Sequence, residues 1–255
     1  MARRAHSQVF LHDRGVINRF VSALPAPSGK PVLEIGPGSG AITHSLLAAG
    51  HRVVAVEIDP CLAKGLADLG HAVDVRIGSI LGFQPRDLIP PPVVVVGALP
   101  YHLSGLILRW LADWADDIAT AAVILQGEVV ERMGAPPGHR ARGLLSIIVQ
   151  SVFDVTPLFR IGSGAFVPRP KVESRAVLLT RRTDGRTVAS WASQWSVARG
   201  LFQHRRKMIR GIIEHRWGEH AARRAAEAGI DLTLRPERLS FLDLETLTTA
   251  LMPGA

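Results

Sequence analysis

The chain is poor in the residues that mark several common classes of protein. Cys61 is the only cysteine among 255 residues, which excludes a disulfide framework and a metal site built on cysteine. The ten histidines show no spacing typical of metal ligands. No apolar run approaches the roughly 18 residues of a membrane span, and no signal-peptide core follows the start. We therefore expect a cytoplasmic protein with no membrane partner and no metal.

Positive charge is the strongest bias in the composition. The chain has 30 Lys and Arg against 22 Asp and Glu, a formal net charge of +8. Such an excess is typical of proteins that bind polyanions such as RNA. Basic residues are densest after Arg181, and a cluster follows Phe202. The alternative explanation is an arginine-rich composition with no role in nucleic-acid binding.

Segments typical of strands and helices alternate through most of the chain. The strands read as nearly continuous apolar runs, which suits a parallel sheet covered on both faces and predicts an α/β fold. Expected strands are 32–35, 52–57, 73–77, 93–96 and 120–125, with 151–159 and 175–180 as antiparallel strands at the sheet edge. Expected helices are 42–49, 61–69, 104–114 and 128–133, and then 188–202, 207–217, 219–228 and 242–251.

A glycine-rich segment, Glu34-Ile35-Gly36-Pro37-Gly38-Ser39-Gly40, follows the first expected strand. Glycines let the backbone turn tightly and approach a ligand, and open parallel sheets bind ligands at this edge. The spacing differs from the dinucleotide-binding G-x-G-x-x-G pattern and is the form used for S-adenosylmethionine. Glu57 ends the second strand, where a carboxylate can accept hydrogen bonds from a ribose diol. The alternative is a structural turn beside a solvated Glu57.

Further segments occur in a fixed order along the chain. They are Ser7–Leu11 (SQVFL), the glycine loop, Glu57–Asp59 (EID), Ala98–Ser104 (ALPYHLS), Gln126–Arg132 (QGEVVER), Ala165–Ser174 (AFVPRPKVES) and Phe202–Lys207 (FQHRRK). Together they resemble the ribosomal RNA adenine N6-methyltransferases. That family includes the small-subunit dimethyladenosine transferases and the Erm-type macrolide-resistance methyltransferases.

The resemblance implies a fold and a function. It implies a Rossmann-like class I methyltransferase with a seven-stranded, mostly parallel sheet over residues 1–182, and a small helical RNA-binding domain over residues 183–255. S-adenosylmethionine would donate the methyl group and adenine N6 of ribosomal RNA would accept it. The expected partner is ribosomal RNA or a ribosomal subunit, bound by a monomer. Between ribosome maturation and antibiotic resistance, we favour a resistance-related role.

The resemblance also implies site residues. The cofactor-binding set is Gln8, Val9, Leu11, Glu34, Gly36, Gly38, Gly40, Glu57, Ile58, Ser79, Ile80 and Ala98. The catalytic set is Ala98, Leu99, Pro100, Tyr101 and Phe166, with the two aromatic rings holding an adenine that has left its stack. The RNA-binding set is Arg205, Arg206, Lys207 and Arg210. The alternatives are a core aromatic at Phe166 and a solvated helix face at the basic segment.

Three positions depart from the family pattern. Val9 and Ala98 stand where the family usually has Asn, and Ser79 stands where it usually has Asp. Val9 and Ala98 lose a polar side-chain group, and Ser79 can make only a weaker hydrogen bond than a carboxylate would. The loss of the contact at Ala98 typically slows catalysis on the order of 100- to 1000-fold. Two other functions therefore stay open. One is a catalytically silent protein that binds RNA or the ribosome, and the other is a scaffold redirected to small-molecule chemistry.

Overall fold

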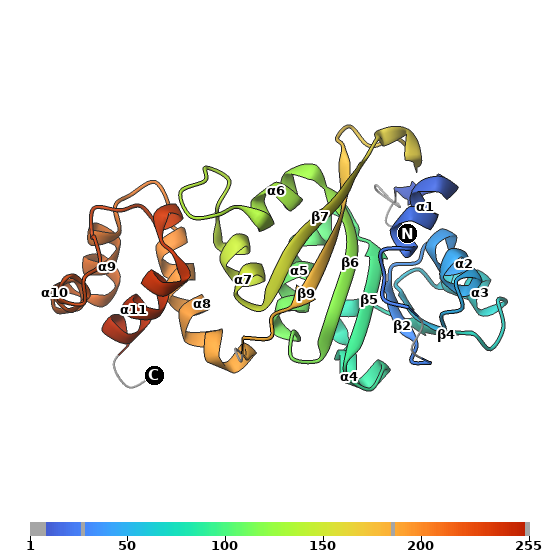
Figure 1. Ribbon diagram of the computed structural model, residues 1–255, viewed down its shortest axis with the longest axis horizontal. Helices are drawn as coiled ribbons and strands as arrows, with labels where there is room; N and C mark the ends of the chain where they lie inside the picture. Colours follow the sequence, from blue (N-terminus) through green and yellow to red (C-terminus); the bar gives the residue numbers. More distant parts are fainter. Residues whose placement is uncertain (1–8, 27–28, 185–186, 253–255) are drawn as a thin grey trace, which may run out of the picture. The chain divides into compact units, whose positions relative to one another are not determined.

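The computed structural model describes residues 9–26, 29–184 and 187–252, and the chain divides into two compact units (Figure 1). The first unit comprises the residues up to Val130 together with Asp154–Arg181. The second comprises Glu131–Phe153 and the residues from Arg182 on. Within the described ranges, no helix has the length and apolar character needed to cross a bilayer.

A seven-stranded sheet dominates the first unit, in the order β4-β3-β2-β5-β6-β9-β7. The five strands from β4 to β6 are parallel to their neighbours, and β9 pairs antiparallel with β6. All residues of β2 and β3 are buried, as expected for strands covered on both faces. The predicted α/β fold with a mostly parallel sheet is confirmed. The strands are β2 (Val32–Ile35), β3 (Val53–Glu57), β4 (Val73–Ile77), β5 (Val93–Ala98), β6 (Ile118–Gln126), β7 (Phe153–Ile161) and β9 (Ser174–Arg181).

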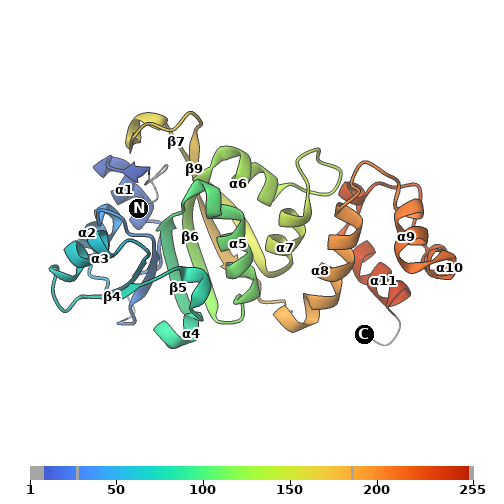
Figure 2. The ribbon, with the colours of Figure 1, turned by 180° about the vertical axis from the view of Figure 1, so that it is seen from behind.

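Three helices of the first unit are close to the predicted positions 42–49, 61–69 and 104–114, whereas the short helix Pro85–Leu88 was not predicted. The helices of this unit include α2 (Ala41–Ala48), α3 (Pro60–Ala67), α4 (Pro85–Leu88) and α5 (Ser104–Asp113), with the short 3-10 turns η1 (Ile80–Gly82), η2 (Tyr101–Leu103) and η3 (Ser163–Ala165). Helix α5 packs against β6 on one face of the sheet (Figure 2). Helix α6 (Gly127–Gly134) follows β6 directly.

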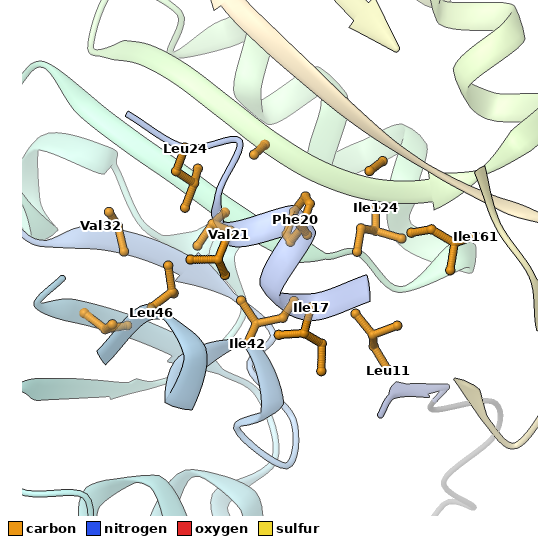
Figure 3. Packing of buried hydrophobic residues seen from close by; sticks show 14 of the residues in the cluster. Leu11, Ile17, Phe20, Val21, Leu24, Val32, Ile42, Leu46, Ile124 and Ile161 are labelled. Carbon is orange, nitrogen blue, oxygen red and sulfur yellow. The ribbon is translucent and has the colours of Figure 1, made fainter. Parts of the chain in front are cut away.

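Helix α1 (Arg14–Val21) was not predicted, and it packs against α2. The side chain of Asp13 begins the helix, because its Oδ1 accepts a hydrogen bond from the backbone N–H of Val16 at 2.9 Å. Ile17 of α1 and Ile42 of α2 are buried in one core with Leu11 (Figure 3). Each such side chain contributes roughly 1.5–3 kcal/mol of stability, so the core fixes α1 against α2.

A two-stranded sheet joins distant parts of the chain beside this core. In β1 (Phe10–Leu11) and β8 (Phe166–Val167), Phe10 pairs with Val167 and Leu11 with Phe166. The backbone N–H of His12 continues the pairing by donating to the carbonyl of Ala165 at 2.9 Å. The N-terminal segment and the segment that carries Phe166 are therefore held together.

The predicted strand 151–159 is wrong at its start. Residues Leu144–Val152 form helix α7, and β7 begins only at Phe153. The helix reads LLSIIVQSV, a mostly apolar and partly β-branched run. Such a run is compatible with a buried strand as well as with a buried helix, so its pattern does not decide between them.

The second unit is helical. Its helices are α7, α8 (Val188–Phe202), α9 (Ile209–Trp217), α10 (Glu219–Glu227) and α11 (Phe241–Leu251), with the turn η4 (Pro236–Arg238). Buried residues from all five helices form one core. Within this unit Trp195 Nε1 donates to Ser151 Oγ at 2.9 Å, which ties α8 to α7.

Candidate active site

A pocket of about 210 Å³ lies at the carboxyl ends of the central parallel strands. Open sheets bind ligands at this edge, where neighbouring strands present their following loops together. The pocket is lined by Val9–Leu11, Gly36–Ser39, Ala41–Ile42, Glu57–Ile58, Ala98–Leu103, Ile124 and Phe166. These residues come from the N-terminal segment, from the ends of β2, β3 and β5, from the start of α2, from β6 and from β8.

The glycine loop leaves β2 and begins α2 in a backbone conformation that few other residues adopt. Gly38 has φ +59°, and an added Cβ would lie 2.9 Å from the ring of Phe10. Gly40 has φ +83°, and its Cβ would lie 2.8 Å from Leu66 Cδ2. The left-handed region and the lack of space both favour glycine here. The loop therefore brings its backbone to the pocket, as the sequence predicts.

Glu57 is buried, with 4% of its surface exposed, and its carboxylate lies between two backbone segments. Its Oε2 accepts from the N–H of Gly38 at 3.0 Å, and its Oε1 accepts from the N–H of Asp59 at 2.9 Å. A carboxylate offers about four lone-pair sites. Glu57 can therefore hold the glycine loop in place and still accept hydrogen bonds from a ligand in the pocket.

Glu34 has a different environment, although it lies on the strand next to β3. It is 1% exposed and does not line the pocket. Thr43 Oγ1 donates to its Oε2 at 2.7 Å, and its Oε1 has no hydrogen-bond partner in the described structure. Burial raises the pKa of the Glu34 carboxyl to about 7, against the lowering effect of the Thr43 hydrogen bond, and the charge of Glu57 adds to the rise.

The segment after β5 supplies the opposite side of the pocket. At Gly97 an added Cβ would lie 2.6 Å from the carbonyl oxygen of Ile35, so only glycine allows this close approach to β2. The N–H of Leu99 donates to the carbonyl of Ile124 at 3.1 Å, which holds the turn to β6. Ala98 brings only a methyl group to this wall.

Tyr101 and Phe166, the two aromatic residues predicted to hold an adenine, both line the pocket. The Tyr101 hydroxyl forms a 2.7 Å hydrogen bond with Ser174 Oγ, which fixes the direction of the ring. Burial raises the pKa of this hydroxyl, and the Ser174 hydrogen bond opposes the rise. Phe166 is 2% exposed, lines the pocket and also belongs to the core. It is therefore a core aromatic and a pocket residue at once.

Other predicted site residues lie elsewhere. Ser79 is exposed and Ile80 is buried in η1, and neither lines the pocket, nor does Gly40. Gln8 lies outside the described residues. In the second unit the four predicted RNA-binding residues are exposed, and Arg205 donates to the carbonyl of Arg140 at 2.6 Å. In the described ranges no cluster of His, Cys, Asp and Glu is arranged to hold a metal ion.

Ser174 is a site residue that the sequence analysis missed. It belongs to a segment that the resemblance includes, but nothing in the segment indicates which residue faces Tyr101. Only the pairing of β9 with β6, which places Ser174 opposite Gln126, brings it to the end of the sheet.

The order of the sheet, the glycine loop and the carboxylate that ends β3 define a Rossmann-like methyltransferase. Comparison with known proteins gives the family. The family model for ribosomal RNA adenine dimethylase matches residues 1–248, and the chain belongs to this family.

Similar curated proteins agree with the family. One is the ribosomal RNA small subunit methyltransferase A of Pseudomonas putida, 39% identical over 247 residues, which cover 94% of this chain and 91% of that protein. Another is the protein of that name from Pseudomonas aeruginosa, 38% identical, with 99% of this chain and 96% of that protein covered.

Solved structures include similar chains. The 23S rRNA methyltransferase ErmE is 26% identical with a TM-score of 0.72, over 95% of this chain and 99% of that one. A dimethyladenosine transferase from Plasmodium falciparum is 20% identical with a TM-score of 0.75, over 93% of this chain and 95% of that one, and this likeness shows the fold alone.

Proposed function

We propose that this protein transfers methyl groups from S-adenosylmethionine to N6 of an adenine in ribosomal RNA. One observation carries the proposal. A single pocket brings together the glycine loop and Glu57, which suit the cofactor, with Tyr101 and Phe166, which suit an adenine ring. The family and the curated relatives named for ribosomal RNA methylation support the same activity.

The residues present fit the cofactor. Glu57 would accept hydrogen bonds from the ribose, and the backbone of Gly36 and Gly38 would lie against the rest of the molecule, with Leu11, Ile58 and Val9 as apolar walls. Ser79 and Ile80 remain proposed cofactor-binding residues, although neither lines the pocket. Glu34 and Gly40 would act indirectly, by supporting the glycine loop. S-adenosylmethionine would supply a methyl group from its sulfonium centre, with the neutral thioether as the leaving group.

The rest of the site would hold the substrate. An adenine reaches a methyl donor only after it leaves its stack, and Tyr101 and Phe166 would bind its faces. The side chain of Ala98 provides no acceptor for the amine, so the carbonyl of Leu99 and the rigid turn at Pro100 would orient the nitrogen lone pair. Orientation of this kind supplies much of the rate enhancement in such reactions.

We propose two candidate RNA substrates, in order of preference. Relatives named for the small subunit match more than nine-tenths of the chain at 38–39% identity, so small-subunit RNA is the first candidate. The likeness to ErmE favours large-subunit RNA, and with it a resistance-related role, as the second. We further propose a cytoplasmic monomer whose residues 183–255 bind RNA through Arg205, Arg206, Lys207 and Arg210.

The test is methyl transfer from labelled S-adenosylmethionine to small subunits, large subunits and each naked ribosomal RNA. The wild type is expected to methylate one of these substrates, and Tyr101→Ala to abolish the transfer. Tyr101→Phe is the matched control, because it keeps the ring and loses only the hydrogen bond with Ser174. The absence of transfer to every substrate, together with no cofactor binding by calorimetry, would overturn the proposal.

A further inference from the structure

A second hollow lies beside the pocket, between α1 and α2. This groove has a volume of about 500 Å³, within the range of ligand-binding sites. Four residues, Phe10, Leu11, Ser39 and Ala41, line both the groove and the pocket. The groove therefore adjoins the pocket, and a molecule that fills the pocket can extend into the groove along these shared residues.

Hydrogen-bond donors dominate the polar lining of the groove. Arg14, the first residue of α1, lines the groove, and so does His12. Asn18 adds an amide on the same helix face one turn later, because residues four apart lie above one another. Among the described residues that line the groove there is no carboxylate. The nearest acid along the chain, Asp13, is occupied in capping α1.

Hydrogen bonds within the protein orient two polar side chains of the groove, Asn18 and His44. Ser45 Oγ donates to Asn18 Oδ1 at 3.0 Å, so the amide oxygen is engaged and the NH₂ group stays available as a donor. His44 Nδ1 lies 2.6 Å from the carbonyl of Gly40, which can only accept, so the proton is on Nδ1. The Ser45–Asn18 contact joins α2 to α1, and the His44–Gly40 contact lies at the start of α2. The core that includes Ile17 and Ile42 also holds these two helices together (Figure 3).

We infer that this groove binds a backbone phosphate of the RNA, next to the nucleotide whose base enters the pocket. The inference rests on the proposed function, because it takes RNA as the substrate. A base that enters the pocket carries its phosphates at the pocket's edge, where the shared residues lead into the groove. Guanidinium and amide donors suit phosphate oxygens, and contacts of this kind fix the register of a nucleic acid on a protein.

The groove is distinct from the basic segment at 205–210, which belongs to the second unit. The groove belongs to the first unit and touches residues of the pocket itself, so its phosphate is fixed relative to the target base. Arg14 is then a positioning residue for substrate, acting by holding the strand that carries the reacting base.

The experiment measures RNA binding against salt concentration for Arg14→Gln, with the full-length protein and naked small-subunit ribosomal RNA, the first candidate substrate. Each phosphate contact contributes about one unit to the slope of log K against log salt, so Arg14→Gln is expected to lower that slope by about 1. The KM for RNA is expected to rise several-fold while cofactor affinity stays at the wild-type value. Arg14→Lys keeps the charge and is expected to keep the slope.

Arg52→Gln is the matched control. Arg52 is exposed and lies at the opposite end of β3 from Glu57, so the same loss of charge there is expected to leave the slope unchanged. An Arg14→Gln slope equal to that of the wild type would overturn the inference. A loss of cofactor affinity with an unchanged RNA slope would also overturn it, since the groove would then hold the cofactor's carboxylate. Binding requires no methyl transfer, so a failure here is distinct from a failure of the proposed function.

Discussion

The pocket has two walls that hold their polar groups differently. On the side of β2 and β3, the carboxylate of Glu57 accepts from the N–H groups of Gly38 and Asp59, so charge and backbone are positioned before any ligand arrives. On the side of the N-terminal segment and β5, Val9 and Ala98 present only apolar side chains. The first wall can orient a polar ligand through hydrogen bonds, whereas the second selects mainly by shape and stacking.

A similar contrast separates the two buried carboxylates of adjacent strands. Glu57 has a partner for each oxygen, while Glu34 has one hydroxyl donor and one oxygen without a partner in the described structure. Burial without full hydrogen bonding favours the neutral form of Glu34, whose pKa is raised to about 7. The pairing of each oxygen, rather than burial alone, therefore decides which carboxylate suits a ligand.

Removing the polar wall is the change with the largest expected effect. Glu57→Ala takes away the acceptor for two backbone N–H groups and for the proposed ribose contact, and each lost buried hydrogen bond costs about 1–3 kcal/mol. Cofactor affinity is expected to fall on the order of 100-fold or more, measured by calorimetry. Glu57→Gln keeps one acceptor oxygen and is expected to lose less. Equal affinity in Glu57→Ala and the wild type would contradict the role of this wall.

Glu34→Gln tests the contrast between the carboxylates through pH. With a pKa raised to about 7 from 4.5, Glu34 keeps its proton in the folded state over a range where the unfolded chain loses it. Its contribution to stability is therefore present below about pH 4.5 and is lost as pH rises to about 7. Relative to the wild type, Glu34→Gln should gain roughly 2 to 3 kcal/mol of unfolding free energy between pH 5 and pH 8.

Urea unfolding of both proteins at several pH values measures this gain. Thr43→Val is a useful companion, because it removes the single donor to Glu34 and should shift the loss of stability to higher pH. A constant difference between Glu34→Gln and the wild type from pH 5 to pH 8 would show that Glu34 keeps one charge state throughout.

Ser79→Asp adds a charge just before η1, outside the lining of the pocket. A carboxylate at this position is expected to tighten cofactor binding roughly tenfold, through a charge-assisted hydrogen bond to the adenine amine. Ser79→Asn is the control, since it adds a polar group of similar size without the charge. Because Ser79 is exposed and does not line the pocket, an unchanged affinity would mean that the adenine ends short of this turn.

Ala98→Asn is the mildest change and addresses the apolar wall. If the amine of the target adenine is held by the Leu99 carbonyl and by stacking, a new side-chain acceptor should raise the rate of methyl transfer or leave it unchanged. A single-turnover assay with saturating cofactor measures the chemical step. A large fall in rate would show that Ala98 makes room for a group that an Asn side chain displaces.

The sequence predicted the parts of the site that local pattern determines. The glycine spacing and the apolar strands placed the loop and Glu57 at one edge of the sheet, and the structure has them there. It did not predict the groove lined by Arg14 and His44, because that groove depends on helix α1 packing against α2. The hydrogen bond between Tyr101 and Ser174 depends on the pairing of strands from distant parts of the chain, which a local sequence pattern does not predict.

The pairing of β1 with β8 has a consequence for when the site is completed during synthesis. The strands β2, β3, β5 and β6 all leave the ribosome before Phe166, whereas the pocket's wall needs Leu11 beside Phe166. Bringing Leu11 and Phe166 together closes the long chain segment between them, which costs on the order of 4 kcal/mol in conformational entropy. The hydrogen bonds between β1 and β8 and the core around Leu11 must offset this cost. A nascent chain that stops short of Phe166 can carry the whole glycine loop and still have no enclosed site.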